Sequence, residues 1–285
     1  KLFMNFNFIK SYAKINLLLS VVGKIKFGLH KIESLVTFLN LYDEIHIKKI
    51  NGKKHKIIFY GKFSKNISKN NTISNLLKIL DQQKLLKTQK FFIKIKKNIP
   101  QQSGMGGGSM NAASLITYFL SKNIIQLSRD KTIKIANLIG SDVKLGLDYK
   151  NTILFSNQKL IRLKNRIGLF CVVVKPNFGC STEEIFKKIK SFSKSRIKKS
   201  SNKFLKIASI LKLKNDLEHI ALKKYPKLKN LKLFMESLPK VKIVRMTGSG
   251  SAIIAYFKTK NASLNAAKIL KKNYKNYWCI LSKTI

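Results

Sequence analysis

Four glycines lie within five positions of this 285-residue sequence, in the segment 104–108, and Ser109 follows them. The residues just before, 91–96, alternate partly between apolar and basic side chains as a strand does, and a small, apolar segment typical of a helix start comes after. Glycine lets backbone N–H groups approach a phosphate, and a helix N-terminus adds unpaired donors and a positive dipole end. The pattern predicts an anion site, at which Ser109 caps the helix or contacts a phosphate or a metal ion.

This loop does not match the two common nucleotide-binding signatures. No lysine follows the glycines as in a P-loop, and no acidic residue ends a second strand about 20 residues on, as in a dinucleotide fingerprint. Asp130 is preceded by helix-like sequence instead. A flexible turn is the remaining alternative for a glycine cluster of this kind.

Two other short segments contain candidates for proton and charge chemistry. Lys14 and Asn16 are two residues apart, so they share one face if their segment is extended. Asp142 follows a helix-like segment in a chain with only 12 acidic residues. Phosphoryl transfer requires phosphates to be held, charge to be neutralised and a hydroxyl to be oriented. By residue type alone, however, Lys14 is a surface lysine and Asp142 a turn or cap residue.

The net charge of +46 is extreme and on its own suggests a nucleic-acid-binding protein. The excess is nearly all lysine, with only five arginines, whereas directed nucleic-acid sites favour arginine forks and aromatic platforms. Lysine, asparagine and isoleucine, which have A/T-rich codons, are abundant throughout. Genome-wide base composition therefore explains the charge, and functional RNA binding is the alternative.

Composition also bounds the class of protein. An apolar content of 45% fits a globular chain, and no apolar run approaches the roughly 18–20 residues of a membrane helix. The opening residues lack the charged, apolar and small-residue pattern of a secretory leader, so we do not expect a secreted protein. The three cysteines, Cys171, Cys180 and Cys279, lack C-x-x-C spacing, which favours a reducing compartment, with the cytoplasm as the default.

Strand-like and helix-like segments alternate along the chain. Strand patterns occur at 32–47, 56–60, 91–96, 152–155, 169–174, 241–246, 252–257 and 277–281, and residues 3–22 read as two extended segments. Helical spacing occurs at 71–86, 109–120, 131–138, 181–189, 203–211, 213–222, 227–238 and 262–271. This mixed order predicts an α+β fold with a domain boundary near residues 156–165.

Six ordered motifs together resemble those of the GHMP kinases, nearly from end to end. Residues 100–113 resemble the ATP loop of that family. The other five are AKINL (13–17), GLH with IES (28–30 and 32–34), GSDV (140–143), NDLE (215–218) and TGSGS (247–251). Within the family, the set is most similar to the branch that phosphorylates a cytidine-diphosphate-linked sugar alcohol.

The resemblance implies a role for each matching residue. Asp142 would accept the proton of the substrate hydroxyl, and Lys14 beside it would keep that carboxylate ionised and favour negative charge at the reacting centre. Asn16 and Asn111 would orient substrate or nucleotide groups. The implied ATP-binding residues are Pro100, Gln101, Gln102, Ser103, Gly104, Met105, Gly106, Gly107, Gly108, Ser109 and Met110.

The cytidine end of the substrate would lie at His30 and Phe186, where aromatic stacking on a base is physically reasonable. Thr182, Gly248 and Ser249 would also contact the substrate. The alternatives are a surface histidine at position 30, a core phenylalanine at 186 and a plain hairpin turn at 248.

The family's fold has two domains, and the resemblance places both in this chain. An N-terminal α/β domain of the ribosomal-protein-S5-domain-2-like type would span 1–158, and a C-terminal ferredoxin-like domain would span 159–285. The implied reaction is ATP-dependent phosphorylation of the 2-hydroxyl of 4-diphosphocytidyl-2-C-methyl-D-erythritol, in the non-mevalonate pathway to isopentenyl diphosphate. Mg²⁺ is expected from the chemistry, with Ser109 as its only suggested ligand. The implied partners are this small molecule and ATP, with no specific nucleic acid and no membrane, for a cytoplasmic monomer or homodimer.

Several residues depart from the family pattern. Phe27, Leu29, Lys144, Met105 and Met110 stand where the family has aspartate, tyrosine, proline, leucine and serine. Three alternatives stay open: a GHMP kinase acting on homoserine or mevalonate, a nucleic-acid-binding protein on a similar scaffold, and a decayed enzyme that still folds. The GLH segment argues against the first, and the two glycine motifs argue against the second.

Overall fold

The computed structural model describes residues 6–25, 30–197 and 207–285. The chain forms two compact units, neither of them one continuous stretch. The first unit takes in the chain up to Ala13, together with Leu41–Pro100 and Gly106–Tyr149. The second comprises Lys14–Asn40, Gln101–Met105 and Lys150–Ile285. Two long strands, β1 (Asn7–Lys24) and β2 (His30–Ile50), contribute residues to both.

In the first unit, a sheet forms from the second half of β2 with β4 (Lys90–Lys96) and β3 (Lys56–Tyr60). β2 and β4 pair antiparallel, with Ile45 opposite Ile95, whereas β3 and β4 pair parallel. Burial alternates strictly along β4, which confirms the strand that the apolar and basic alternation predicted there.

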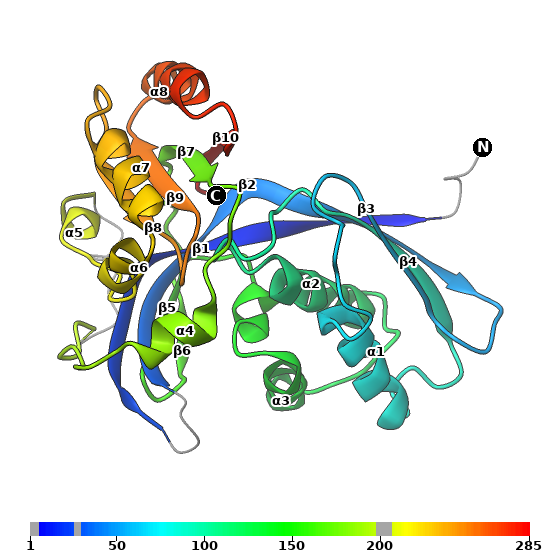
Figure 1. Ribbon diagram of the computed structural model, residues 1–285. Helices are drawn as coiled ribbons and strands as arrows, with labels where there is room; N and C mark the ends of the chain where they lie inside the picture. Colours follow the sequence, from blue (N-terminus) through cyan, green and yellow to red (C-terminus); the bar gives the residue numbers. More distant parts are fainter. Residues whose placement is uncertain (1–5, 26–29, 198–206) are drawn as a thin grey trace. The chain divides into compact units, whose positions relative to one another are not determined.

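Helices α1 (Thr72–Gln82), α2 (Gly107–Ser121) and α3 (Arg129–Ile139) and the 3-10 helix η2 (Val143–Leu147) pack against one another in this unit (Figure 1). Asn71 caps α1 by accepting hydrogen bonds from the backbone N–H groups of Ile73 and Ser74. The apolar side chains at helical spacing in α1, which are Ile73, Leu76, Leu77 and Leu80, enter a core with the inner faces of α2, β2 and β4.

The expectation that Ser109 caps the helix after the glycines is wrong. α2 begins two residues earlier, at Gly107, and its N-cap is Gly106, which is in the left-handed region with φ 67°. Ser109 therefore lies inside the first turn. No side chain caps the N-terminus of this helix.

In the second unit, β7 (Phe170–Lys175), β8 (Ile243–Met246), β9 (Ile253–Phe257) and β10 (Trp278–Lys283) form an antiparallel sheet in the order β10-β7-β9-β8. Helices α7 (Pro226–Glu236) and α8 (Lys260–Asn273) pack on it (Figure 1). Strand, helices, two strands, helix and strand in this order make a ferredoxin-like fold. The α+β class and the ferredoxin-like half are thereby confirmed.

The remaining elements of this unit are β5 (Thr152–Leu154), β6 (Leu160–Arg162), α4 (Thr182–Lys187), α5 (Ile207–Leu211) and α6 (Glu218–Lys224). β5 pairs with the first half of β2 and also with β6, a strand that the sequence did not predict.

Two sequence expectations differ from the structure in this part of the chain. Residues 7–24 form the single strand β1 rather than two segments, and the helix expected at 213–222 begins only at Glu218. The reason for the second difference is a contact distant in sequence. Leu19 of β1 donates its N–H to the carbonyl of Lys214, and the Leu19 carbonyl accepts the N–H of Asp216. These two bonds keep the backbone at 214–216 out of a helix.

Within the ranges that the structure describes, no helix combines the length and the apolar character needed to cross a lipid bilayer.

Candidate active site

The first glycine loop turns sharply because alternate residues in it have left-handed backbone. Gln102, Gly104 and Gly106 have φ values of 49°, 74° and 67°. Left-handed residues in a loop let successive N–H groups line one concave turn, and the start of α2 adds further unpaired donors. The geometry fits the predicted anion site.

Within the second unit, the second glycine turn packs directly against this loop. A Cβ added at Gly104 would lie 2.0 Å from the carbonyl oxygen of Thr247, and one added at Gly248 would lie 2.9 Å from the carbonyl oxygen of Gly104. Only glycine fits at both positions, because two backbones meet there. The Thr247 hydroxyl also donates to the Gly104 carbonyl at 3.3 Å.

Strand β1 completes this contact. Lys14 donates its backbone N–H to the carbonyl of Met105 at 3.1 Å, and Asn16 donates its backbone N–H to the Thr247 hydroxyl at 3.1 Å. On the other side of the loop, Ser251 donates its backbone N–H to the carbonyl of Gln102. Three motifs that lie far apart in the sequence therefore meet around residues 101–105.

The side chains of Lys14 and Asn16 form a buried pair, with only 4% and 5% of each residue exposed. The Lys14 ammonium donates to Asn16 Oδ1 at 2.9 Å, and Asn16 Nδ2 donates to the Ser34 hydroxyl at 2.8 Å. Lys14 is thus not the surface lysine that residue type alone suggests. Its ammonium group is held in a fixed direction.

The motif at 215–218 holds the second glycine turn through hydrogen bonds. The amide of Asn215 donates to the carbonyls of Met246 and Gly248, at 2.9 and 2.8 Å. Glu218 accepts the backbone N–H of Met246 at 2.6 Å, and burial raises the pKa of that carboxyl. This motif was part of the family resemblance but had no predicted role. The structure shows that its polar groups hold β8 and the turn after it.

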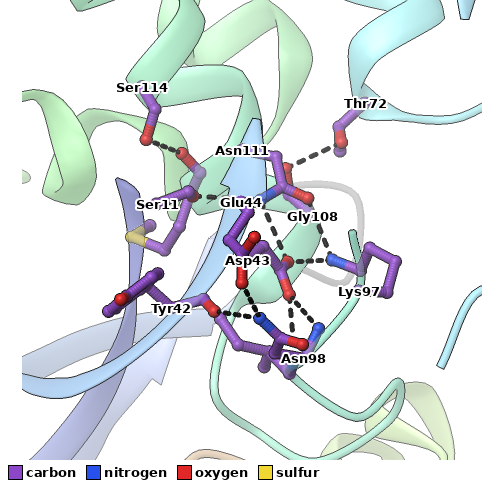
Figure 2. Close-up of polar contacts among 12 residues, drawn as sticks. Ser11, Tyr42, Asp43, Glu44, Thr72, Lys97, Asn98, Gly108, Asn111 and Ser114 are labelled. Atoms are coloured by element: carbon purple, nitrogen blue, oxygen red, sulfur yellow. Dashed lines mark hydrogen bonds and ion pairs between the residues drawn. The ribbon is translucent and has the colours of Figure 1, made fainter. Parts of the chain in front are cut away.

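A second polar cluster lies in the first unit around Asp43, a fully buried residue of β2. Figure 2 shows the side chains that converge on it. Asp43 Oδ1 accepts the backbone N–H groups of Asn98 and Ile99, at 2.8 and 2.9 Å. Asp43 Oδ2 is paired with the Lys97 ammonium and accepts from Asn111 Nδ2 at 3.0 Å. Four donors satisfy this carboxylate, so it is a structural anchor and not a proton acceptor.

This cluster, which sequence reasoning missed apart from Asn111, ties the strand before the glycine loop to α2. Lys97 Nζ also donates to Asn111 Oδ1 at 2.9 Å, and Asn111 Nδ2 donates to the Ser11 hydroxyl at 3.0 Å. The Asn111 amide is therefore engaged at both ends, and it positions α2. A Cβ added at Gly107 would lie 3.4 Å from Lys97 Nζ, which places a buried cation beside the first turn of α2.

Asp142 belongs to the first unit and stands at the N-cap of η2, where its side chain makes no capping hydrogen bond. Two residues before it, a Cβ on Gly140 would lie 3.9 Å from the Ser109 hydroxyl, so the first turn of α2 faces this segment. Lys144, only 3% exposed, lies close by. Burial lowers the pKa of the Lys144 ammonium, and the nearby Asp142 carboxylate offsets part of that shift.

The structure brings the substrate-binding candidates together in two groups within the second unit. The ring centroids of His30 and Phe186 are 5.0 Å apart. The hydroxyls of Thr182 and Ser249 are hydrogen-bonded at 2.7 Å. Phe27 and Leu29 lie outside the described residues.

The candidate ATP-binding residues differ in exposure. Gln101 and Gln102 are exposed, whereas Pro100, Ser103, Met105 and Met110 are buried. Only main-chain groups of the two methionines are therefore suited to contact a nucleotide. Gly108, which is exposed, accepts a hydrogen bond from the Thr72 hydroxyl through its carbonyl, at 2.8 Å.

Comparison with known proteins matches both halves of the chain to one family. Residues 71–149 match the GHMP kinases N terminal domain, and residues 197–276 match the GHMP kinases C terminal domain. The 4-diphosphocytidyl-2-C-methyl-D-erythritol kinase of Pelagibacter ubique is 52% identical over 282 residues, which cover 99% of this chain and 100% of that protein. The chain belongs to the 4-diphosphocytidyl-2-C-methyl-D-erythritol kinase family of the GHMP kinases.

A more distant relative has the same name, and two solved structures share the fold. The kinase of the same name from Anaplasma phagocytophilum is 30% identical over 98% of this chain and 94% of its own length. A crystal structure of 4-(cytidine 5'-diphospho)-2C-methyl-D-erythritol kinase superimposes with a TM-score of 0.80 at 22% identity, covering 97% of this chain and 99% of that one. A homoserine kinase from Cytophaga hutchinsonii shares the GHMP kinase fold, with a TM-score of 0.69 at 14% identity over 98% and 94% of the two chains.

Proposed function

We propose that this protein transfers the γ-phosphoryl group of ATP to the 2-hydroxyl of 4-diphosphocytidyl-2-C-methyl-D-erythritol and releases ADP. The reaction belongs to the methylerythritol phosphate pathway to isopentenyl diphosphate. The observation that carries the proposal is the 52% identity to a kinase of that name over nearly the whole of both chains. As a member of a kinase family, the chain uses ATP as its phosphoryl donor.

The glycine loop and the first turn of α2 are the proposed site for the ATP phosphates. Three consecutive residues, Gly106, Gly107 and Gly108, leave that helix start without side chains that would keep a phosphate away. The helix dipole makes this end of α2 positive, while the buried Lys97 ammonium beside Gly107 is already paired with the Asp43 carboxylate. The neighbouring residues from Pro100 to Met110 would line the nucleotide.

Asp142 is the proposed proton acceptor for the substrate hydroxyl, and Lys14 its partner. A lysine ammonium near a carboxylate favours the ionised form and stabilises charge on a transferring phosphoryl group. Lys14 meets one requirement of that role, since its ammonium is fixed by Asn16. The two residues belong to different units, and their pairing is part of the proposal.

Mg²⁺ is the expected companion of ATP, and the chain offers groups that suit it. No group of three His, Cys, Asp or Glu side chains gathers as a metal site within residues 6–25, 30–197 and 207–285. Mg²⁺ bound with a nucleotide needs no such group, because phosphates and water supply most of its ligands. The Ser109 hydroxyl, which faces the segment with Asp142, would contact the ion. Such an ion would neutralise charge on the phosphates.

The proposal keeps the division of the chain into homologous domains at 1–158 and 159–285, within which both family matches fall. It places His30, Phe186, Thr182, Gly248, Ser249 and Asn16 at the substrate. The site of action is the cytoplasm, because Cys171, Cys180 and Cys279 are free thiols, as is usual in a reducing compartment.

ADP release measured with three acceptors tests this function. With 4-diphosphocytidyl-2-C-methyl-D-erythritol, ATP and Mg²⁺, we expect turnover far above the rate without acceptor. Homoserine and mevalonate, tested in parallel, should give the background rate, because neither carries a cytidine. Turnover with either of them but not with the cytidine compound would refute the proposal.

A further inference from the structure

The loop after α4 places a third aromatic ring at His30, beside the candidate cytidine residues. The ring centroid of Phe192 lies 6.4 Å from that of His30, on which Phe186 also packs, at 5.0 Å. Phe192 is 44% exposed. A single exposed phenylalanine is ordinary on a protein surface, but this one lies beside the candidate cytidine-binding residues.

His30 itself is incompletely satisfied. Its Nε2 atom is buried and has no hydrogen-bond partner among the described residues. Burial, and secondly the charge of Lys24, lower the pKa of the imidazole, so the ring is neutral near pH 7. A buried polar atom without a partner costs stability, and a ligand with a polar edge would remove that cost.

Hydrogen bonds on its C-terminal side fix the backbone that presents Phe192. Ser193 donates its N–H to the carbonyl of Val21 at 2.9 Å. Ser195 and Arg196 donate to the carboxylate of Glu33, at 2.7 and 3.2 Å, and Glu33 is only 2% exposed. These bonds tie the loop to Val21 of β1 and to Glu33 of β2, which come before and after His30 in the sequence.

We propose that Phe192 is a specificity-determining residue that stacks on the cytosine ring of the substrate, with Phe186 and His30. The inference rests on the proposed function and extends it to a residue that the sequence did not mark. A pyrimidine offers π faces for the two phenylalanines and a polar edge for His30 Nε2. The residue directly before His30 is Leu29, where the family has tyrosine, so this position offers no aromatic ring. Phe192 supplies an aromatic ring from a different part of the chain.

Replacing Phe192 tests this role through binding as well as turnover. Phe192→Ala should raise the Kd for cytidine 5'-diphosphate, and the KM for the full substrate, by about 5- to 150-fold, the range for loss of one base-stacking side chain. kcat and the KM for ATP should change little, because the ring does not touch the reacting atoms. Phe192→Trp should restore tight binding.

The matched control is Leu233→Ala in α7, which removes another exposed apolar side chain, 55% exposed against 44% for Phe192, that is not part of the His30 cluster. Thermal melting of each variant verifies that it folds. The tryptophan introduced by Phe192→Trp gives a second readout, since stacking of cytosine on it should quench its fluorescence relative to the wild type with its single Trp278.

The outcomes separate this inference from the proposed function. If the wild type binds cytidine 5'-diphosphate but Phe192→Ala binds it equally well, Phe192 has no stacking role and the inference is wrong. Lack of quenching in Phe192→Trp with binding intact would contradict it too. If the wild type neither binds cytidine 5'-diphosphate nor turns over the cytidine substrate, the proposed function itself fails.

Discussion

Asp43 and Asp142 both neighbour the first turns of α2, yet their environments suit them to different roles. Asp43 is fully buried and receives four donors, so its charge is committed to holding the loop and the helix together. Asp142 stands at the start of a short 3-10 helix that its side chain does not cap. Neighbouring groups rather than residue type decide which acid is suited to accept a proton.

Replacing Asp142 by asparagine should lower kcat by about 10²- to 10⁴-fold, the usual contribution of a general base, and leave ATP binding nearly unchanged. Lys14→Ala should behave similarly, and the double variant should lose less than the product of the two effects if the residues act as a unit. Steady-state ADP release and nucleotide titration measure both quantities. Asp130→Asn, an exposed acid in the first turn of α3, is the control. If Asp142→Asn keeps more than about a third of wild-type kcat, it is not the base.

Asp43→Ala should destabilise the protein by about 3–5 kcal/mol, because it leaves the Lys97 ammonium buried without its counter-ion. Denaturant unfolding measures the change. Glu183→Ala removes an exposed ion pair with Lys187 on α4 and should leave the midpoint nearly unchanged. Equal effects of the two substitutions would show that the Asp43 cluster does not stabilise the fold as described.

At the scale of elements, local signals account for the helices that could be predicted, and distant contacts account for those that could not. α1 was predictable because its apolar spacing and its Asn71 cap are both local. The segment 213–217 was not, because hydrogen bonds with β1, some 200 residues away in the chain, keep residues 214–216 out of a helix. The start of α2 was placed late because a left-handed glycine, not Ser109, ends the preceding loop.

Gly104→Ala tests the contact between the two glycine motifs. The added methyl group would meet the Thr247 carbonyl at 2.0 Å, so the loop and the turn must separate. We expect a clear loss of thermal stability together with weaker ATP binding. Gly168→Ala is the matched control, because Gly168 has a similar φ of 68° but no atom within 4 Å of the added Cβ. Similar melting and ATP affinity for the two variants would mean that backbone strain alone, without the contact, explains the effect.

For the whole molecule, the net charge of +46 should govern non-specific binding of polyanions, although it says little about function. A polyanion should bind this surface at low salt whatever its sequence, since each lysine contact with a phosphate releases counter-ions. Between about 50 and 200 mM salt, we expect the affinity for RNA to fall at least about 100-fold, as measured by filter binding or anisotropy. Heparin should compete as well as any RNA. Selective nanomolar binding to one RNA at physiological salt would overturn this view of the charge.

The sequence was sufficient for the family and the two-domain class, because short motifs survive as ordered sets even in a lysine-rich chain, and the roles of its site candidates stay predictions. It could not reveal what surrounds each motif. The burial of Lys14, the saturation of Asp43 and the support that Asn215 gives to Gly248 all depend on residues brought together by folding. Phe192 belongs to no motif, and only its distance from His30 draws attention to it.

The structure of the reaction product shows directly which hydroxyl group this protein phosphorylates. The wild-type protein is incubated with ATP, Mg²⁺ and 4-diphosphocytidyl-2-C-methyl-D-erythritol. Phosphorus NMR follows the reaction until the acceptor is consumed. We expect one new phosphomonoester signal without three-bond coupling to a proton, because the 2-hydroxyl is tertiary and its carbon bears no hydrogen. ADP should form in equal amount, and the diphosphate of the substrate should stay intact. A phosphate on another hydroxyl, ADP with only inorganic phosphate, or no consumption of the cytidine compound would contradict it.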